Sequence, residues 1–150
     1  MFVMRRRSFL LSCAAMPLAL RADASDPWSA QELMQPAELA EKLKGSHAKL
    51  HLICVAFPVL YRQRHIAGAA LAGPTSKPEG IADLNAALAK LDKNQMLVLY
   101  CGCCPMQKCP NIRPAYSAAK NAGFTNVRVL SLPTNFHTDW VAKGYPTDGV

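Results

Sequence analysis

Long apolar runs, runs of basic residues and internal repeats are missing from most of this 150-residue sequence. The apolar stretch that ends at Leu20 is shorter than the about 20 residues that a membrane-spanning helix needs. Beyond the first residues, no cluster of lysines or arginines indicates nucleic-acid binding. Of the four histidines, none has a partner at a spacing typical of metal ligands. These absences direct attention to the cysteines.

The N-terminus has the pattern of an export signal. Residues 6–10 (RRSFL), followed by an apolar run, resemble the bacterial twin-arginine motif. Residues 22–24 (Ala-Asp-Ala) supply a small-x-small cleavage site. We therefore predict a signal peptide over residues 1–24 and one domain over residues 25–150. We expect a periplasmic or otherwise exported bacterial protein without stable membrane insertion after cleavage; the alternative is a short uncleaved membrane anchor.

The sequence beyond residue 24 is weakly basic and rich in cysteine. It holds 13 lysines and arginines against 9 acidic residues, a net charge of +4, which suits a small anionic substrate. About 126 residues are enough for one domain with its own core. An odd number of cysteines in an exported protein indicates disulfides together with one free reactive thiol. These cysteines are Cys54, Cys101, Cys103, Cys104 and Cys109.

Apolar spacing predicts helices that alternate with strands. Helices are predicted at residues 36–44, 81–91 and 111–122, with a last helical turn at 139–143. Strands are predicted at residues 50–55, 66–71, 96–100 and 126–130. Residues 25–35 are predicted to be a lead without regular structure. The alternation predicts an α/β fold with a central, mostly parallel sheet and helices on both faces.

Four of the cysteines fall within nine positions, directly after the most apolar predicted strand. A strand-to-helix junction gathers backbone N–H groups and the positive end of a helix dipole, which favour a thiolate. We therefore predict an accessible thiolate nucleophile at Cys101. The amides of the following loop are expected to bind an anion, with Lys108 and Arg113 as candidate cations. The predicted binding residues are Gly102, Cys103, Cys104, Pro105, Met106, Gln107 and Lys108.

Several segments, in order, resemble the rhodanese-like sulfurtransferase domain between Pro36 and Pro146. They are residues 53–56 (ICVA), 64–69 (RHIAGA), 99–101 (LYC), 123–127 (GFTNV) and the ending Trp140 with 144–146 (GYP). The resemblance implies a rhodanese-like α/β fold. It also implies that Cys101 carries sulfur and that His65 has a structural role near the loop.

The sequence departs from the family pattern around Cys101. The family's acidic residue, arginine and glutamate before the tyrosine are replaced by Cys54, Ala56 and Leu60. In the family loop C-x-x-G-x-R, Cys104 holds the glycine position and Met106 the arginine position. The resemblance therefore implies the fold more firmly than the activity.

The resemblance implies persulfide chemistry without a cofactor. Cys101 would attack the outer sulfur of a small anionic donor such as thiosulfate and hold that sulfur as a persulfide. It would then pass the sulfur to an acceptor thiol or anion, so that one difficult step becomes two easier ones.

The other cysteines leave three alternatives open. Cys101 and Cys104 have the C-x-x-C spacing of thiol–disulfide oxidoreductases, in which Cys104 would resolve a bond at Cys101; the same attack on a persulfide would release sulfide. Together with Cys103 and Cys109 they form a thiol set that suits a soft metal. The spacing differs from that of structural zinc sites, so we assign no metal ligand. Finally, Cys103 or Cys104 would brace the loop through a disulfide to Cys109.

Overall fold

The structure is a computed structural model that describes residues 26–45 and 49–149. The predicted signal peptide lies outside these residues, and its export role stays a prediction. Among the helices that the model describes, none combines the length and the apolar character needed to cross a membrane.

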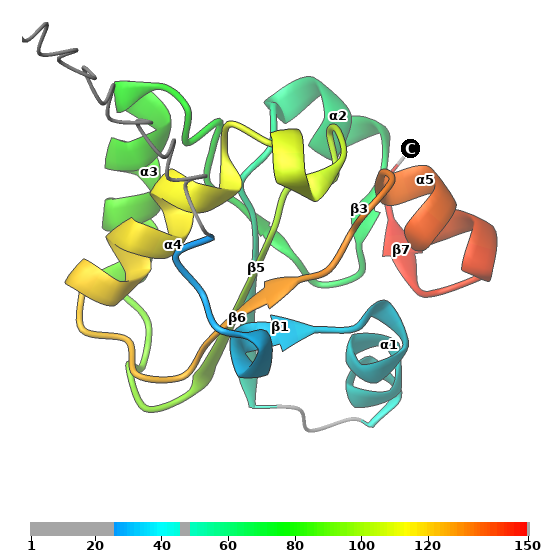
Figure 1. The fold of residues 1–150 in the computed structure, drawn as a ribbon, viewed down its shortest axis with the longest axis horizontal. Helices are drawn as coiled ribbons and strands as arrows, with labels where there is room; N and C mark the ends of the chain where they lie inside the picture. The colour runs from blue at the N-terminus through cyan, green and yellow to red at the C-terminus, as the bar shows by residue number, and fades with distance from the viewer. Residues whose placement is uncertain (1–25, 46–48, 150) are drawn as a thin grey trace, which may run out of the picture.

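A five-stranded parallel sheet forms the centre of the fold, with strand order β1-β6-β5-β2-β4 (Figure 1). Its middle strands are buried on both faces, which explains their nearly continuous apolar sequences. In register, Ile53 lies beside Leu99, and Leu99 lies beside Val129. The prediction of a mostly parallel sheet is confirmed. The strands are β1 (Leu33–Met34), β2 (Leu50–Cys54), β4 (Ala70–Leu71), β5 (Met96–Tyr100) and β6 (Val127–Leu130).

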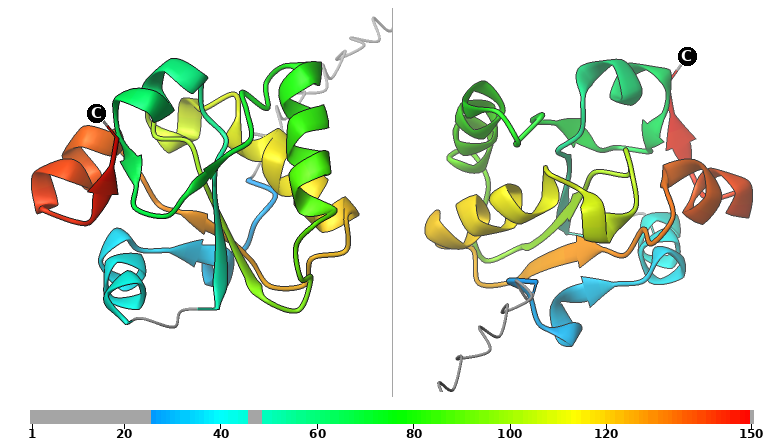
Figure 2. Two further views of the ribbon diagram at one scale, coloured as in Figure 1. Left: turned by 180° about the vertical axis from the view of Figure 1, so that it is seen from behind. Right: turned by 45° about the horizontal axis from the view of Figure 1, so that its top comes forward.

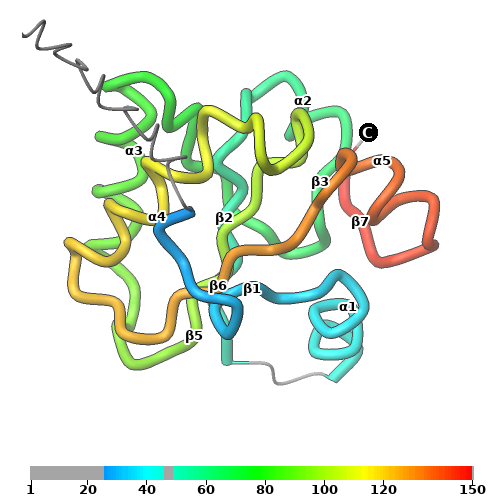
Figure 3. The backbone as a smooth tube through the Cα atoms, viewed as in Figure 1, coloured from blue at the N-terminus to red at the C-terminus, as the bar shows by residue number. Residues whose placement is uncertain are grey.

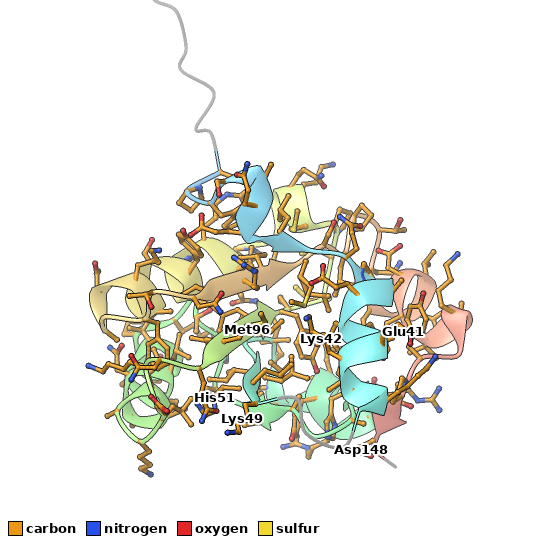
Figure 4. All side chains as sticks on the ribbon, turned by 90° about the horizontal axis from the view of Figure 1, so that it is seen from below. Glu41, Lys42, Lys49, His51, Met96 and Asp148 are labelled. Atoms are coloured by element: carbon orange, nitrogen blue, oxygen red, sulfur yellow. The ribbon has the colours of Figure 1, made fainter. Side chains whose placement is uncertain are left out.

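Helices lie on both sides of this sheet, as predicted. Helices α3 and α4 pack against each other on one side, and α1 lies on the other side with α5 (Figures 1 and 4). Helices α1, α2 and α3 each begin with a proline in the first turn, where its missing N–H leaves no bond unmade. The helices are α1 (Pro36–Lys44), α2 (Pro58–Gln63), α3 (Pro78–Leu88), α4 (Ile112–Asn121) and α5 (Phe136–Asp139).

A second, two-stranded sheet joins the middle of the chain to its C-terminal segment. β3 (His65–Ile66) pairs antiparallel with β7 (Thr147–Asp148) (Figure 2). The single strand predicted at residues 66–71 is therefore two strands, β3 and β4, that belong to different sheets. The fully buried Trp140 fixes the C-terminal segment, because its Nε1 donates to the carbonyl of Pro146 at 2.9 Å.

The prediction for residues 25–35 is wrong over the described part of that segment. A short 3-10 helix, η1 (Ala30–Glu32), leads into β1, which pairs with β6 at the edge of the sheet. Met34 is fully buried and Trp28 nearly so. A two-residue strand is too short to show periodicity, and its pairing partner lies far along the chain, so local sequence could not reveal it.

Most helix boundaries follow the predictions, with two departures. The last helical turn, predicted at residues 139–143, is instead α5, which ends at Asp139, and a separate 3-10 helix, η3 (Val141–Lys143). Helix α1 and strand β5 match the predicted ranges residue for residue, whereas α3 begins at Pro78 rather than at residue 81. Helix α2 was not predicted. It has no buried residue, and Val59 and Leu60 are exposed, so it lacks the apolar face by which helices are recognised.

The carboxyl ends of the central strands face α2 and the segment that follows β5 (Figure 3). The hydroxyl of Tyr100, the last residue of β5, accepts a hydrogen bond from the backbone N–H of Ile66 at 3.0 Å. This bond connects the end of the central strand to β3 just after α2. Tyr100, just before the cysteine-rich segment, is therefore fixed both by the central sheet and by this bond to β3.

Candidate functional site

Cys101 follows directly after β5, at the carboxyl end of the central strand. Its side chain is only 7% exposed, yet it lines a cavity of about 480 Å³. Helix α2 and the segment around α5 provide most of the remaining wall. The lining residues are Cys54, Ala56, Leu60, Tyr61, Gln63, Arg64, Tyr100, Cys101, Gly102, Cys103, Asn135, Phe136, His137 and Val141.

Gly102 turns the chain out of the strand in a conformation that other residues rarely adopt. Its φ is +72°, and a Cβ placed there would lie 2.7 Å from the Cβ of Phe136. Its carbonyl accepts a hydrogen bond from the Phe136 N–H at 3.1 Å. Glycine is therefore required twice, for the left-handed backbone and for the close approach of α5.

The sulfur atoms of the loop form one cluster. Cys101 Sγ donates to Cys103 Sγ at 3.2 Å, and Cys103 Sγ lies 3.2 Å from Cys104 Sγ. The sulfurs of Cys101, Cys103 and Cys109 lie within 4.8 Å of one another. All the described cysteines are free thiols, so the disulfide brace to Cys109 is not formed. The C-x-x-C spacing predicted Cys104 as the sulfur that would react with Cys101. In the structure, the sulfur in contact with Cys101 is that of Cys103.

Asn111 contacts the cluster through its side-chain amide and was not among the residues predicted from sequence. It is fully buried, and its Nδ2 donates to Cys101 Sγ at 3.4 Å and to Cys103 Sγ at 3.9 Å. Its Oδ1 accepts from the Ser76 N–H at 2.9 Å, which fixes the direction of the amide. The only sequence signal was a polar residue where α4 begins, directly after the cysteine loop (residues 101–109).

The negative charge of the cluster lies beside Cys101 rather than on it. The Cys101 thiol, as hydrogen-bond donor, lowers the pKa of Cys103 to about 5 and that of Cys109 to about 7. Hydrogen bonding to Cys103 and Cys109, together with burial, raises the pKa of Cys101. The prediction of an accessible thiolate at Cys101 is therefore wrong: hydrogen bonds to the neighbouring sulfurs, together with burial, keep the proton on Cys101. Burial raises the pKa of Cys104 to about 12.

The predicted binding segment contributes less to the cavity than expected. The Met106 N–H donates to the carbonyl of Leu132 at 3.2 Å, and the Lys108 N–H donates to Pro105 at 2.8 Å, so these amides bind within the fold. Of the predicted binding residues, Gly102 and Cys103 line the cavity. Cys104 and Met106 line a narrower crevice behind the loop, and Pro105, Gln107 and Lys108 line neither.

The cations at the cavity also differ from those predicted. Arg113 forms an ion pair with Asp26 and lies over the Trp28 ring, 5.6 Å from its centroid; it does not line the cavity. Arg64 does, and no aspartate or glutamate is among the described lining residues. Arg64, at the end of α2, entered the sequence analysis only as part of the segment at residues 64–69. The cavity is suited to an anion.

His65 and Tyr61 form a structural pair beside the cavity. Their rings stack with centroids 3.8 Å apart, and His65 Nδ1 is bonded to the Tyr61 carbonyl at 2.8 Å. The Tyr61 hydroxyl donates to the carbonyl of Ala69 at 2.6 Å. His65 therefore fixes the end of α2, in keeping with the structural role expected for it.

Comparisons with known proteins agree with this architecture. The family model described as "Rhodanese-like domain" matches residues 35–132. The rhodanese-like domain of the Alr3790 protein from Anabaena sp., solved by NMR, is 22% identical with a TM-score of 0.58; the match covers 79% of this chain and 80% of that one. The BH2092 protein from Bacillus halodurans is 19% identical with a TM-score of 0.61, over 78% and 76% of the two chains. At these identities the solved structures show similarity of fold. No curated protein matches the chain.

Proposed function

The chain belongs to the rhodanese-like domain family, and on that premise we propose that it is a sulfurtransferase carrying sulfane sulfur as a persulfide on Cys101. One observation carries the proposal. The Cys101 sulfur lines a cavity at the carboxyl end of the central strand and already donates a hydrogen bond to a proton acceptor, the Cys103 sulfur, 3.2 Å away. In open α/β sheets this edge is where ligands bind.

The loading step follows from that contact. As Cys101 attacks the outer sulfur of thiosulfate, its proton passes to the Cys103 thiolate along the existing hydrogen bond. The sulfur–sulfur bond of thiosulfate breaks, and sulfite leaves with the electron pair. Asn111 Nδ2, which donates to Cys101 Sγ at 3.4 Å, stabilises negative charge that develops on the sulfur.

The cavity supports a small anionic donor. Arg64 lines it without any described carboxylate, so a dianion such as thiosulfate meets favourable charge. The guanidinium of Arg64 offers a planar set of donors for such an oxyanion. An acceptor thiol or anion would enter through the same opening after sulfite leaves.

Mass spectrometry tests the proposal directly. The reduced protein, treated with thiosulfate and quenched within the first turnover, should carry one added sulfur atom on the peptide that contains Cys101, and sulfite should be released in equal amount. Cys101→Ser should do neither, whereas Cys54→Ala, which removes a thiol that lines the same cavity, should load normally. Sulfur found on Cys103, or loading by Cys101→Ser, would overturn the assignment.

We further propose that residues 1–24 direct export through the twin-arginine route. That route delivers folded proteins, so the cluster would be assembled before it meets an oxidising compartment. Replacing Arg6 and Arg7 by lysine should retain the protein in the cytoplasm in cell fractionation. Unchanged export of this variant would contradict the proposal.

A soft-metal site is a second candidate function, favoured by one observation. The sulfurs of Cys101, Cys103 and Cys109 lie close enough for one ion, and an all-thiolate donor set selects copper(I) or zinc. Metal analysis of the purified protein should then find about one equivalent, which Cys109→Ser should lose. Metal-free protein that also fails to bind added copper(I) or zinc would remove this candidate.

A further inference from the structure

We infer that Cys103 discharges the Cys101 persulfide internally, releasing sulfide and leaving a Cys101–Cys103 disulfide. The inference rests on the proposed persulfide and extends it. It makes the chain a reductase of sulfane sulfur at the expense of a dithiol, rather than a carrier that passes the sulfur on intact.

The geometry places the attacking sulfur next to its target. Cys103 Sγ and Cys101 Sγ are 3.2 Å apart, and a disulfide bond is about 2.05 Å long, so bond formation needs a movement of about 1 Å. Both side chains line the same cavity. Only Gly102 separates them in sequence, so no larger rearrangement of the loop is needed to bring them together.

The neighbouring groups favour this thiol over the others. Cys103 is partly exposed and its sulfur already lies 3.2 Å from Cys101 Sγ, whereas Cys109 is buried. Cys104 contacts Cys103, but it lines the narrower crevice rather than the cavity that holds the Cys101 sulfur. Asn111 Nδ2 reaches both Cys101 and Cys103, which keeps the two sulfurs on one donor during the exchange.

The step balances without an added reactant. After loading, Cys103 holds the proton taken from Cys101, and this proton passes to the outer sulfur of the persulfide. The Cys103 thiolate then attacks Cys101 Sγ, the persulfide bond breaks, and hydrosulfide leaves with the electron pair. Two thiol sulfurs are oxidised and the sulfane sulfur is reduced. A dithiol reductant restores the free thiols before the next cycle.

A single-turnover experiment tests the inference. The protein is reduced, freed of reductant and mixed with one equivalent of thiosulfate, and sulfite and sulfide are both measured. Sulfite reports loading of Cys101, and sulfide reports discharge. For the wild type we expect about one sulfide per sulfite and a Cys101–Cys103 disulfide in the peptide map.

Cys103→Ser should release at least tenfold less sulfide per sulfite and should retain the persulfide on Cys101, even if loading is slower without the base. Cys109→Ser, which removes another thiol of the cluster, should still release about one sulfide per sulfite, even if its loading rate changes. Sulfite release with a stable wild-type persulfide would overturn the inference and leave the proposed function standing. A wild-type Cys101–Cys109 disulfide would also overturn it. Absence of sulfite from the wild type would overturn both.

Discussion

The side-chain amide of Asn111 donates to the sulfur of Cys101 over 3.4 Å, although the two residues are ten positions apart. They meet because the cysteine loop returns to the end of β5 just where α4 begins. The Ser76 N–H holds the other side of the amide, so Asn111 presents a donor to the sulfur. A buried amide in this position stabilises a thiolate or persulfide without adding charge.

Replacing Asn111 by aspartate should slow sulfur transfer. The substitution keeps the shape of the side chain but places a carboxylate against the sulfurs, which disfavours negative charge on them. We expect sulfite release from thiosulfate to fall at least tenfold and the pKa of the Cys103 thiol to rise. Asn121→Asp, at the exposed end of the same helix, is the control and should transfer sulfur normally. Equal rates for the two variants would contradict the role of Asn111.

Alkylation of the cluster should be selective at mildly acidic pH. Thiolates react and thiols do not, so the rate at each cysteine rises as the pH passes its pKa. With iodoacetamide and peptide mass spectrometry, Cys103 should reach half its maximal rate near pH 5, because its pKa is lowered to about 5. Cys101→Ala removes the donor and should move this midpoint upward, toward that of an ordinary thiol. A wild-type midpoint already in the ordinary range would show that Cys101 does not act as donor.

Arg64 should determine the affinity for an anionic donor. Arg64→Ala removes a positive charge from the cavity wall, and we expect KM for thiosulfate to rise about tenfold, while kcat changes little. Arg62→Ala removes an exposed arginine of the same helix that does not line the cavity. Steady-state kinetics of the two variants separate a local contact from a general effect of net charge, which would raise KM equally in both.

Substitution of Gly102 should be more costly than substitution of another left-handed glycine. Gly102→Ala forces a left-handed backbone and brings a Cβ to 2.7 Å from Phe136 Cβ, so we expect a loss of about 3 kcal/mol in the free energy of unfolding. Gly68→Ala has a similar φ of +78° but meets no atom within 4 Å, and it should lose about 1 kcal/mol. Urea unfolding measures both. Equal losses in the free energy of unfolding would mean that α5 shifts to accommodate the added Cβ at little cost.

Glu32 should stabilise the fold in a pH-dependent manner. The Ser29 N–H and the Tyr116 hydroxyl, both donating to its carboxylate, lower its pKa to about 2 from an ordinary value of 4.5. Its ionised form therefore stabilises the fold above about pH 4.5, and this contribution is lost as the pH falls toward 2.

Glu32→Gln should accordingly lower the urea midpoint at pH 7, and the difference from the wild type should shrink steadily below pH 4.5. Glu38→Gln, on the exposed face of α1, should show little difference at either pH. A difference at Glu32 that is independent of pH would point to lost packing rather than to the ionised carboxylate.

The local sequence pattern predicted an element correctly where the residues of that element themselves show its apolar periodicity or its end signals. The continuous apolar run predicted both ends of β5 correctly. The proline and the glycine on either side of α1 did the same for that helix. Strand β1 has only two residues and exists because β6 pairs with it. No window of the sequence contains that information.

The site was predictable in position but not in its charges. The cysteine-rich segment after the central strand marked where the cavity lies. Which sulfur keeps the proton depends on separations among Cys101, Cys103 and Cys109 that loop geometry sets. The orientation of Asn111 depends on Ser76, from a distant loop, and the choice of Arg64 over Lys108 depends on how α2 packs.

The cysteine loop is fastened to its surroundings through main-chain atoms alone at two places, Gly102 to Phe136 and Met106 to Leu132. Neither anchor involves a sulfur atom. The thiols between and beside these anchors can thus change bonding partners without breaking either main-chain hydrogen bond. Cycles of oxidation and reduction would then leave the shape of the surrounding surface nearly constant, and a reducing protein would meet the same face in every state.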